Sequence, residues 1–113
     1  MTATRVNPAH YTYRVTWSSE DAEYAAQCLE LPSVSWLAVT KEDALAGLER
    51  IVREAVNDMN ESGEQVPTPF ADHHYSGKFN VRIPESLHRR LATEAAEQGV
   101  SLNRLVSNRL ATD

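Results

Sequence analysis

A short alternating segment, Lys78–Pro84, is the feature that most constrains how this chain can fold. Its apolar residues are Phe79, Val81 and Ile83, and its polar residues are Lys78, Asn80 and Arg82. Because side chains of a β-strand point alternately to opposite faces, this pattern predicts a strand with one apolar and one polar face. A single short strand cannot bury its own apolar face. The segment therefore predicts a partner strand as well.

Two helix signals follow this strand. Pro84 lies at or just before a helix start, Gly99 is a typical helix stop, and Ser101 is a favourable N-cap for a second helix. The apolar positions that share a face are Leu87, Leu91 and Ala95 in the first helix and Leu102, Leu105, Val106 and Leu110 in the second. A module of this size rarely builds a sufficient core without disulfides, metal or oligomerisation. Since it contains no cysteine, we expect it to dimerise.

The first part of the chain predicts a different module, and the whole chain is therefore expected to be of the α+β class. Alternating or apolar runs over 11–17, 23–31 and 34–39 predict three short strands in an antiparallel meander. Thr40 then caps a long helix that ends near residues 60–63. The predicted domains are residues 1–70 and 78–113, joined by a linker over 71–77.

Charge also divides the chain. The 113 residues carry a formal net charge of −5. Residues 1–76 contain five Lys/Arg and twelve Asp/Glu, giving −7, whereas residues 77–113 contain six and four, giving +2. The acidic part should attract a basic partner and repel phosphates. The single cysteine excludes a disulfide framework within one chain, and with no membrane span or signal peptide evident, a cytoplasmic location is expected.

The polar face of the Lys78–Pro84 strand has a candidate function. Its ammonium, amide and guanidinium groups can hydrogen-bond base edges in the major groove of DNA. The alternation by itself would favour a simpler interpretation, in which these three polar residues form the solvent-exposed face of an edge strand. The helix–Gly–helix pattern that follows favours DNA reading instead.

Together, the strand and the two helices resemble a ribbon-helix-helix domain of the Arc and MetJ type. In that family two chains pair their strands into a ribbon that enters the major groove, and the helices form the dimer core. The resemblance implies base reading by Lys78, Asn80 and Arg82 and phosphate binding by Ser101, Leu102 and Asn103. The implied dimer core is Phe79, Val81, Ile83, Leu87, Leu91, Leu105 and Val106.

The front module resembles HicB-type antitoxins of the HicA–HicB toxin–antitoxin family. The motifs that carry this resemblance are Tyr11–Trp17, Leu31–Ser35, Thr40–Leu45 and Gly63–Pro69. The turn over Ser18–Glu23 lacks its usual glycine, and Ala38 stands where a glycine is usual. The resemblance implies a partial ribonuclease-H-like fold that binds a small basic HicA-like ribonuclease toxin. It also implies repression of the chain's own operon by a homodimer, or a tetramer, on operator DNA.

No catalytic residues, cofactor or metal site are expected. Nuclease chemistry needs carboxylates that converge on Mg²⁺, and most carboxylates here lie in a turn or on the polar side of a helix. Adjacent His73 and His74 cannot easily bind one ion. Trp17 and Trp36 are interpreted as core or interface aromatics, and either becomes a candidate toxin anchor if exposed. The alternative function is a stand-alone ribbon-helix-helix regulator whose front module senses a small molecule or a metal.

Overall fold

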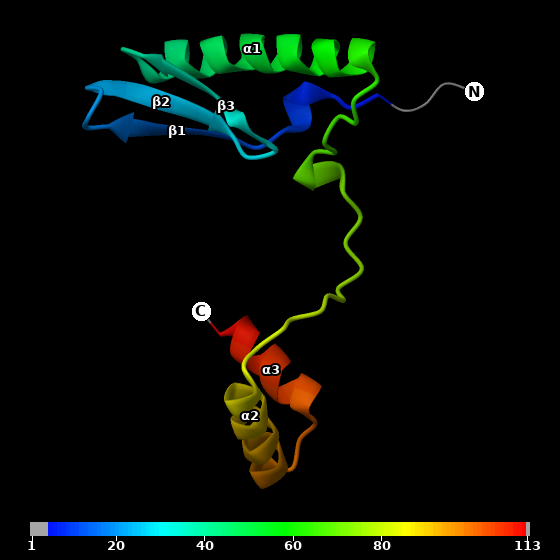
Figure 1. The fold of residues 1–113 in the computed structure, drawn as a ribbon. Helices are drawn as coiled ribbons and strands as arrows, with labels where there is room; N and C mark the ends of the chain where they lie inside the picture. The colour runs from blue at the N-terminus through cyan, green and yellow to red at the C-terminus, as the bar shows by residue number, and fades with distance from the viewer. Residues whose placement is uncertain (1–4, 113) are drawn as a thin grey trace. The chain divides into compact units, whose positions relative to one another are not determined.

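A computed structural model describes residues 5–112, which form two compact units: the first ends at Tyr75 and the second begins at Ser76. The fold is α+β, with a three-stranded antiparallel sheet followed by three helices (Figure 1). In chain order the elements are the 3-10 helix η1 (Pro8–His10), strands β1 (Tyr13–Ser18), β2 (Glu23–Cys28) and β3 (Leu31–Ala38), helix α1 (Lys41–Ser62), the 3-10 helix η2 (Phe70–Asp72), and helices α2 (Glu85–Gln98) and α3 (Leu102–Ala111).

The predicted meander is present, with strand order β1-β2-β3, but the strand ends differ from those expected. Pro32 lies inside β3 and does not interrupt it. The register passes from Gln27 opposite Ser35 to Cys28 opposite Leu31, so residues 32–34 face an irregularity in the ladder. Because β3 is also an edge strand, the missing N–H of Pro32 costs little there.

Helix α1 covers one face of the sheet in the first unit (Figure 1). Its predicted start is confirmed, since the Thr40 side chain accepts a 3.1 Å hydrogen bond from the Asp43 N–H. Its end at Gly63 is confirmed too, with φ of 77° in the left-handed region. The core between helix and sheet consists of Tyr11, Ala26, Cys28, Leu31, Ala44, Leu48, Val52 and Val56.

A glycine inside α1 has a role that the sequence did not reveal. A Cβ on Gly47 would lie 2.1 Å from Nε1 of Trp36, so the indole ring of β3 occupies the space that any other residue would need. Arg50, one turn later, places its guanidinium carbon 4.9 Å from the centre of the same ring. The close approach of α1 to β3 therefore depends on Gly47.

The second unit contains α2 and α3, and both predicted boundaries between them are confirmed. Gly99 ends α2 with φ of 70°, and the Val100 N–H donates to the Ala95 carbonyl. The strand predicted over residues 78–84 is not formed, because a β-strand needs a hydrogen-bonded neighbour and the described part of this chain gives the segment none. Among residues 5–112, no helix is long and apolar enough to cross a membrane.

Candidate functional site

The segment before α2 is exposed along its whole length. Lys78, Asn80 and Arg82, the predicted base readers, are all accessible to solvent. A short turn leads into them: the Lys78 N–H donates to the Ser76 hydroxyl at 3.1 Å, and Gly77 has φ of 81°. The segment thus presents three donor-bearing side chains outside any helix.

The apolar side chains of the same segment have not been buried. Phe79 is 77% exposed, Val81 65% and Ile83 39%. Each such side chain would gain roughly 1.5–3 kcal/mol on full burial. The segment therefore carries an apolar surface for which the described part of one chain supplies no cover.

The predicted dimer-core residues of α2 and α3 are only partly enclosed. Leu105 is buried, whereas Leu87, Leu91 and Val106 are half-buried. Leu110, in the last turn of α3, is 67% exposed. The packing of α2 against α3 therefore buries part of the apolar face of each helix and leaves the rest of that face exposed.

The N-terminus of α3 is where the sequence predicts phosphate binding. The Ser101 side chain caps the helix by accepting a 3.0 Å hydrogen bond from the Arg104 N–H. The first N–H groups of a helix, here those of Leu102 and Asn103, have no partner within the helix. Ser101 and Asn103 are exposed and Leu102 is half-buried, so the predicted phosphate-binding residues are accessible to solvent.

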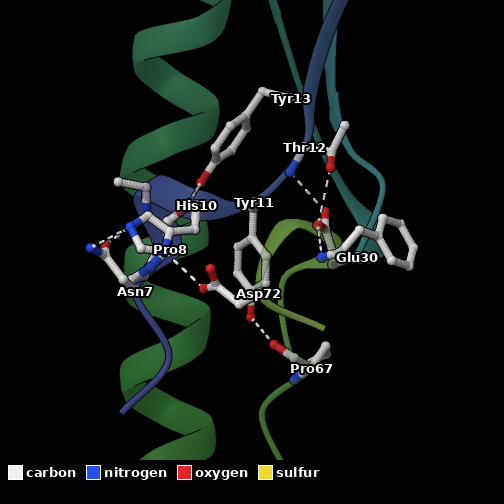
Figure 2. A network of polar contacts seen from close by, with 11 residues as sticks. Asn7, Pro8, His10, Tyr11, Thr12, Tyr13, Glu30, Pro67 and Asp72 are labelled. Carbon is white, nitrogen blue, oxygen red and sulfur yellow. Dashed lines mark hydrogen bonds and ion pairs between the residues drawn. The ribbon is translucent and has the colours of Figure 1, made fainter. Parts of the chain in front are cut away.

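A buried carboxylate organises the first unit, and sequence reasoning did not identify its role. Glu30 follows β2 and is 8% exposed (Figure 2). Its oxygens accept hydrogen bonds from the Thr12 N–H at 2.9 Å, the Thr12 hydroxyl at 3.1 Å and the Phe70 N–H at 3.0 Å. Burial alone would raise the pKa of Glu30, but these hydrogen bonds outweigh it and hold the pKa below its ordinary value. The ionised carboxylate joins the start of β1 to the segment after α1.

Two tyrosines extend this network (Figure 2). The Tyr11 hydroxyl donates to the Pro67 carbonyl at 2.7 Å, and the Tyr13 hydroxyl donates to the Pro8 carbonyl at 2.6 Å. Burial, together with the neighbouring ionisable groups of Cys28 and Glu49, raises the pKa of Tyr13 to about 12. Both phenols therefore remain protonated donors and serve the fold.

The histidines do not form a metal cluster in the described part of the chain. His10 Nδ1 lies 2.8 Å from Asp72 Oδ2, which joins η1 to η2. Within residues 5–112, no three His, Cys, Asp or Glu side chains gather in a way that could hold a metal ion. Cys28 is buried, and burial raises the pKa of its thiol, so the neutral form is favoured.

Comparison with known proteins gives one match. The model of the HicB family matches residues 61–110, from the last turn of α1 into the last turn of α3. No curated protein and no solved structure matches the chain. The matched residues include Gly63–Pro69, one of the motifs that carried the resemblance, whereas the motifs between Tyr11 and Leu45 lie outside it. Residues 61–110 are thus similar to the HicB family, an antitoxin family whose members act on a toxin partner.

Proposed function

We propose that this protein is a HicB-type antitoxin that represses its own operon as a dimer. The observation that carries the proposal is the uncovered apolar strip of Phe79, Val81 and Ile83, directly before two capped helices and inside the region similar to HicB. A second copy of the segment would supply the missing strand partner and cover the strip. The second unit would then form a ribbon-helix-helix domain.

In this dimer the polar face of the ribbon reads DNA. Lys78, Asn80 and Arg82 would project from each strand into the major groove, and the N-terminus of α3 would hold a backbone phosphate. The local charge of +2 over residues 77–113 favours this contact, whereas the −7 of the preceding residues opposes it. DNA binding therefore belongs to the second unit.

The first unit binds the toxin in this proposal. It is a meander with one helix, in the manner of a partial ribonuclease-H-like fold, and it catalyses no reaction. Its buried carboxylate, Glu30, is already engaged by the Thr12 N–H and hydroxyl and by the Phe70 N–H. The partner would be a small basic ribonuclease of the HicA type, drawn to the acidic surface and covered by direct contact.

The base-reading part of the proposal is tested with Arg82→Ala. If Arg82 makes a bidentate contact to guanine, binding to the cognate operator weakens by about 1–3 kcal/mol and sequence preference at that base relaxes. Arg14→Ala is the matched control, because Arg14 is an exposed arginine in the first unit. Operator affinity is measured by fluorescence anisotropy at fixed salt. Equal affinity of the wild type and Arg82→Ala would remove Arg82 from the reading set.

The separation of the two roles is tested with Phe79→Glu in the full chain. A charge on the apolar strip should abolish dimerisation and repression while toxin neutralisation remains. Tyr75→Glu is the control, because Tyr75 is also an exposed aromatic, at 62%. Loss of neutralisation together with repression would contradict the assignment of the roles to separate units. If the wild-type chain represses transcription but neutralises no toxin, the alternative function of a stand-alone regulator is favoured.

A further inference from the structure

Of the two tryptophans, Trp17 is the exposed one. It is 55% exposed near the end of β1, whereas Trp36 is half-buried against α1. Trp17 pairs across the ladder with Tyr24, and their rings meet edge to face with centroids 5.1 Å apart. α1 packs chiefly on β3 and β2, and β1 is an edge strand. Trp17 is therefore left uncovered at this edge of the sheet, whereas Tyr24 is half-buried against the core.

The residues around the pair are mostly acidic. Glu20 and Asp21 lie in the turn that joins β1 to β2, directly after the strand that carries Trp17. Lys41, the first residue of α1, places its ammonium 5.7 Å from the centre of the Tyr24 ring. Lys41 thus places a positive charge against Tyr24, and Glu42 and Asp43 follow it in the first turn of the helix.

Glu42 can be placed beside the pair from helix geometry. Glu49 of α1 lies close enough to Tyr13 of β1 for its charge to affect that phenol. Glu42 precedes Glu49 by seven residues, so it lies on the same flank of the helix, roughly 10 Å nearer the helix start. The helix starts where β3 ends, at Ala38 opposite Tyr24, which is the Trp17 end of the sheet. Helix geometry therefore places Glu42 at the Trp17 end of the sheet, on the flank of α1 that faces β1.

We propose that Trp17 and Tyr24 form the anchor of a binding surface for a basic protein, with Glu20, Asp21 and Glu42 as its rim. This inference rests on the proposed function, since the basic protein is then the toxin. Tryptophan and tyrosine are enriched among residues that dominate binding energy, and acidic groups around them steer a basic partner and fix its orientation. The acidic rim opposes a nucleic acid at this surface. It also opposes a second copy, because two identical acidic rims would repel.

The test uses the full chain and a catalytically inactive HicA-type toxin, with binding measured by titration calorimetry. Trp17→Ala should weaken toxin binding by about 30-fold or more, which is the loss typical of an anchor residue. Trp17→Phe should restore part of that loss because it keeps an aromatic ring. Phe70→Ala is the matched control: Phe70 is an aromatic, 49% exposed, and its N–H bonds Glu30 at the opposite end of the sheet. The control should bind like the wild type.

A second arm tests the rim. Glu42→Lys should slow association severalfold at low salt, with less effect at high salt. Glu61→Lys makes the same charge change near the other end of α1 and should have a smaller effect. Thermal unfolding of each variant confirms that the fold is kept.

The possible results separate the two proposals. If the wild type binds the toxin and Trp17→Ala binds equally well, the anchor assignment is overturned while the antitoxin function stands. If the wild type binds no HicA-type toxin, both proposals fail. If Trp17→Ala changes the sedimentation of the chain alone, a second copy covers the pair and the basic partner is the wrong occupant.

Discussion

The two units of this chain differ in how many apolar side chains they bury within one copy of the chain. In the first unit, helix α1 and the sheet enclose a core of eight buried residues within one chain. In the second unit, of the residues described, only Ala95 and Leu105 are buried apolar side chains, and four large ones stay exposed. The first unit thus has a core of its own, although large apolar side chains such as Trp17 and Val39 stay exposed on it as well. The second, with fewer than 40 residues, has a core of a size that seldom suffices alone.

The largest expected effect tests this difference directly. Leu48→Ala should lower the free energy of unfolding of the first unit by about 2–5 kcal/mol, because Leu48 is fully buried and a cavity remains. That loss should be the same at every protein concentration. Leu105→Ala should also destabilise the second unit, because Leu105 is buried there. In that unit the apparent stability of both the wild type and the variant should rise by about 1.4 kcal/mol of dimer for each tenfold rise in concentration, as expected if folding and dimerisation are coupled.

The measurement is urea denaturation followed by the NMR signals of each unit at several concentrations. Leu110→Ala is a control, since Leu110 is already 67% exposed in the second unit. Concentration-independent unfolding of the second unit would break the comparison, because that unit would then be stable as a single copy.

Gly47→Ala sharpens the account of the first unit. Alanine favours a helix more than glycine by about 1 kcal/mol, so an exposed site would be stabilised. Here the new Cβ would meet the Trp36 indole at 2.1 Å, and we expect a net loss of about 1–3 kcal/mol from overpacking. The double variant with Trp36→Ala should lose less than the sum of the two single changes. If thermal unfolding shows that the two losses are additive, residues 47 and 36 do not interact energetically, and the overpacking explanation is wrong.

Acid should weaken the first unit through Glu30. Because hydrogen bonds lower the pKa of Glu30 in the fold, its contribution is fully present above the pKa of the unfolded chain and disappears as the pH falls through the folded-state pKa. Glu30→Gln should cost about 1–3 kcal/mol at neutral pH, since an amide cannot accept all three hydrogen bonds. The variant should also lose stability less steeply on acidification. Equal pH slopes for the variant and the wild type in calorimetry would assign the acid sensitivity to other groups.

The smallest expected effect concerns the turn between β1 and β2. Ala22 has φ of 54°, a left-handed conformation that glycine adopts without strain. Ala22→Gly should raise the free energy of unfolding by up to about 1 kcal/mol, because the relief of strain exceeds the entropy cost of glycine. Ala25→Gly, in the regular part of β2, should destabilise the fold instead. Chemical denaturation of both variants checks the sign.

Features that depend on local sequence could be predicted, and features that depend on distant residues could not. Thr40, Gly63, Gly99 and Ser101 set their helix ends through groups a few residues away, and all four predictions are confirmed. The position of Pro32 within β3 depends on the ladder with β2, and so was missed. Glu30 contacts residues 18 and 40 positions away, and Gly47 is explained only by Trp36. No local pattern signals such contacts.

The candidate site follows the same rule. The alternating segment over 78–84 could be recognised from neighbouring residues, but a strand forms only with a partner, and its pairing remains a prediction. The exposed state of Trp17 was not predictable either, because it depends on which strands α1 covers. The missing glycine of the β1–β2 turn was visible in the sequence, whereas the conformation of Ala22 required the structure.

The placement of the two tryptophans gives the protein a built-in optical label. Both belong to the first unit, and the second contains neither. Tryptophan emission therefore reports only on the first unit, while the helical signal in circular dichroism reports on both. The exposed indole of Trp17 should be open to a soluble quencher, and the indole of Trp36, packed against Gly47, should be shielded. The molecule can thus be followed one unit at a time without attaching a dye.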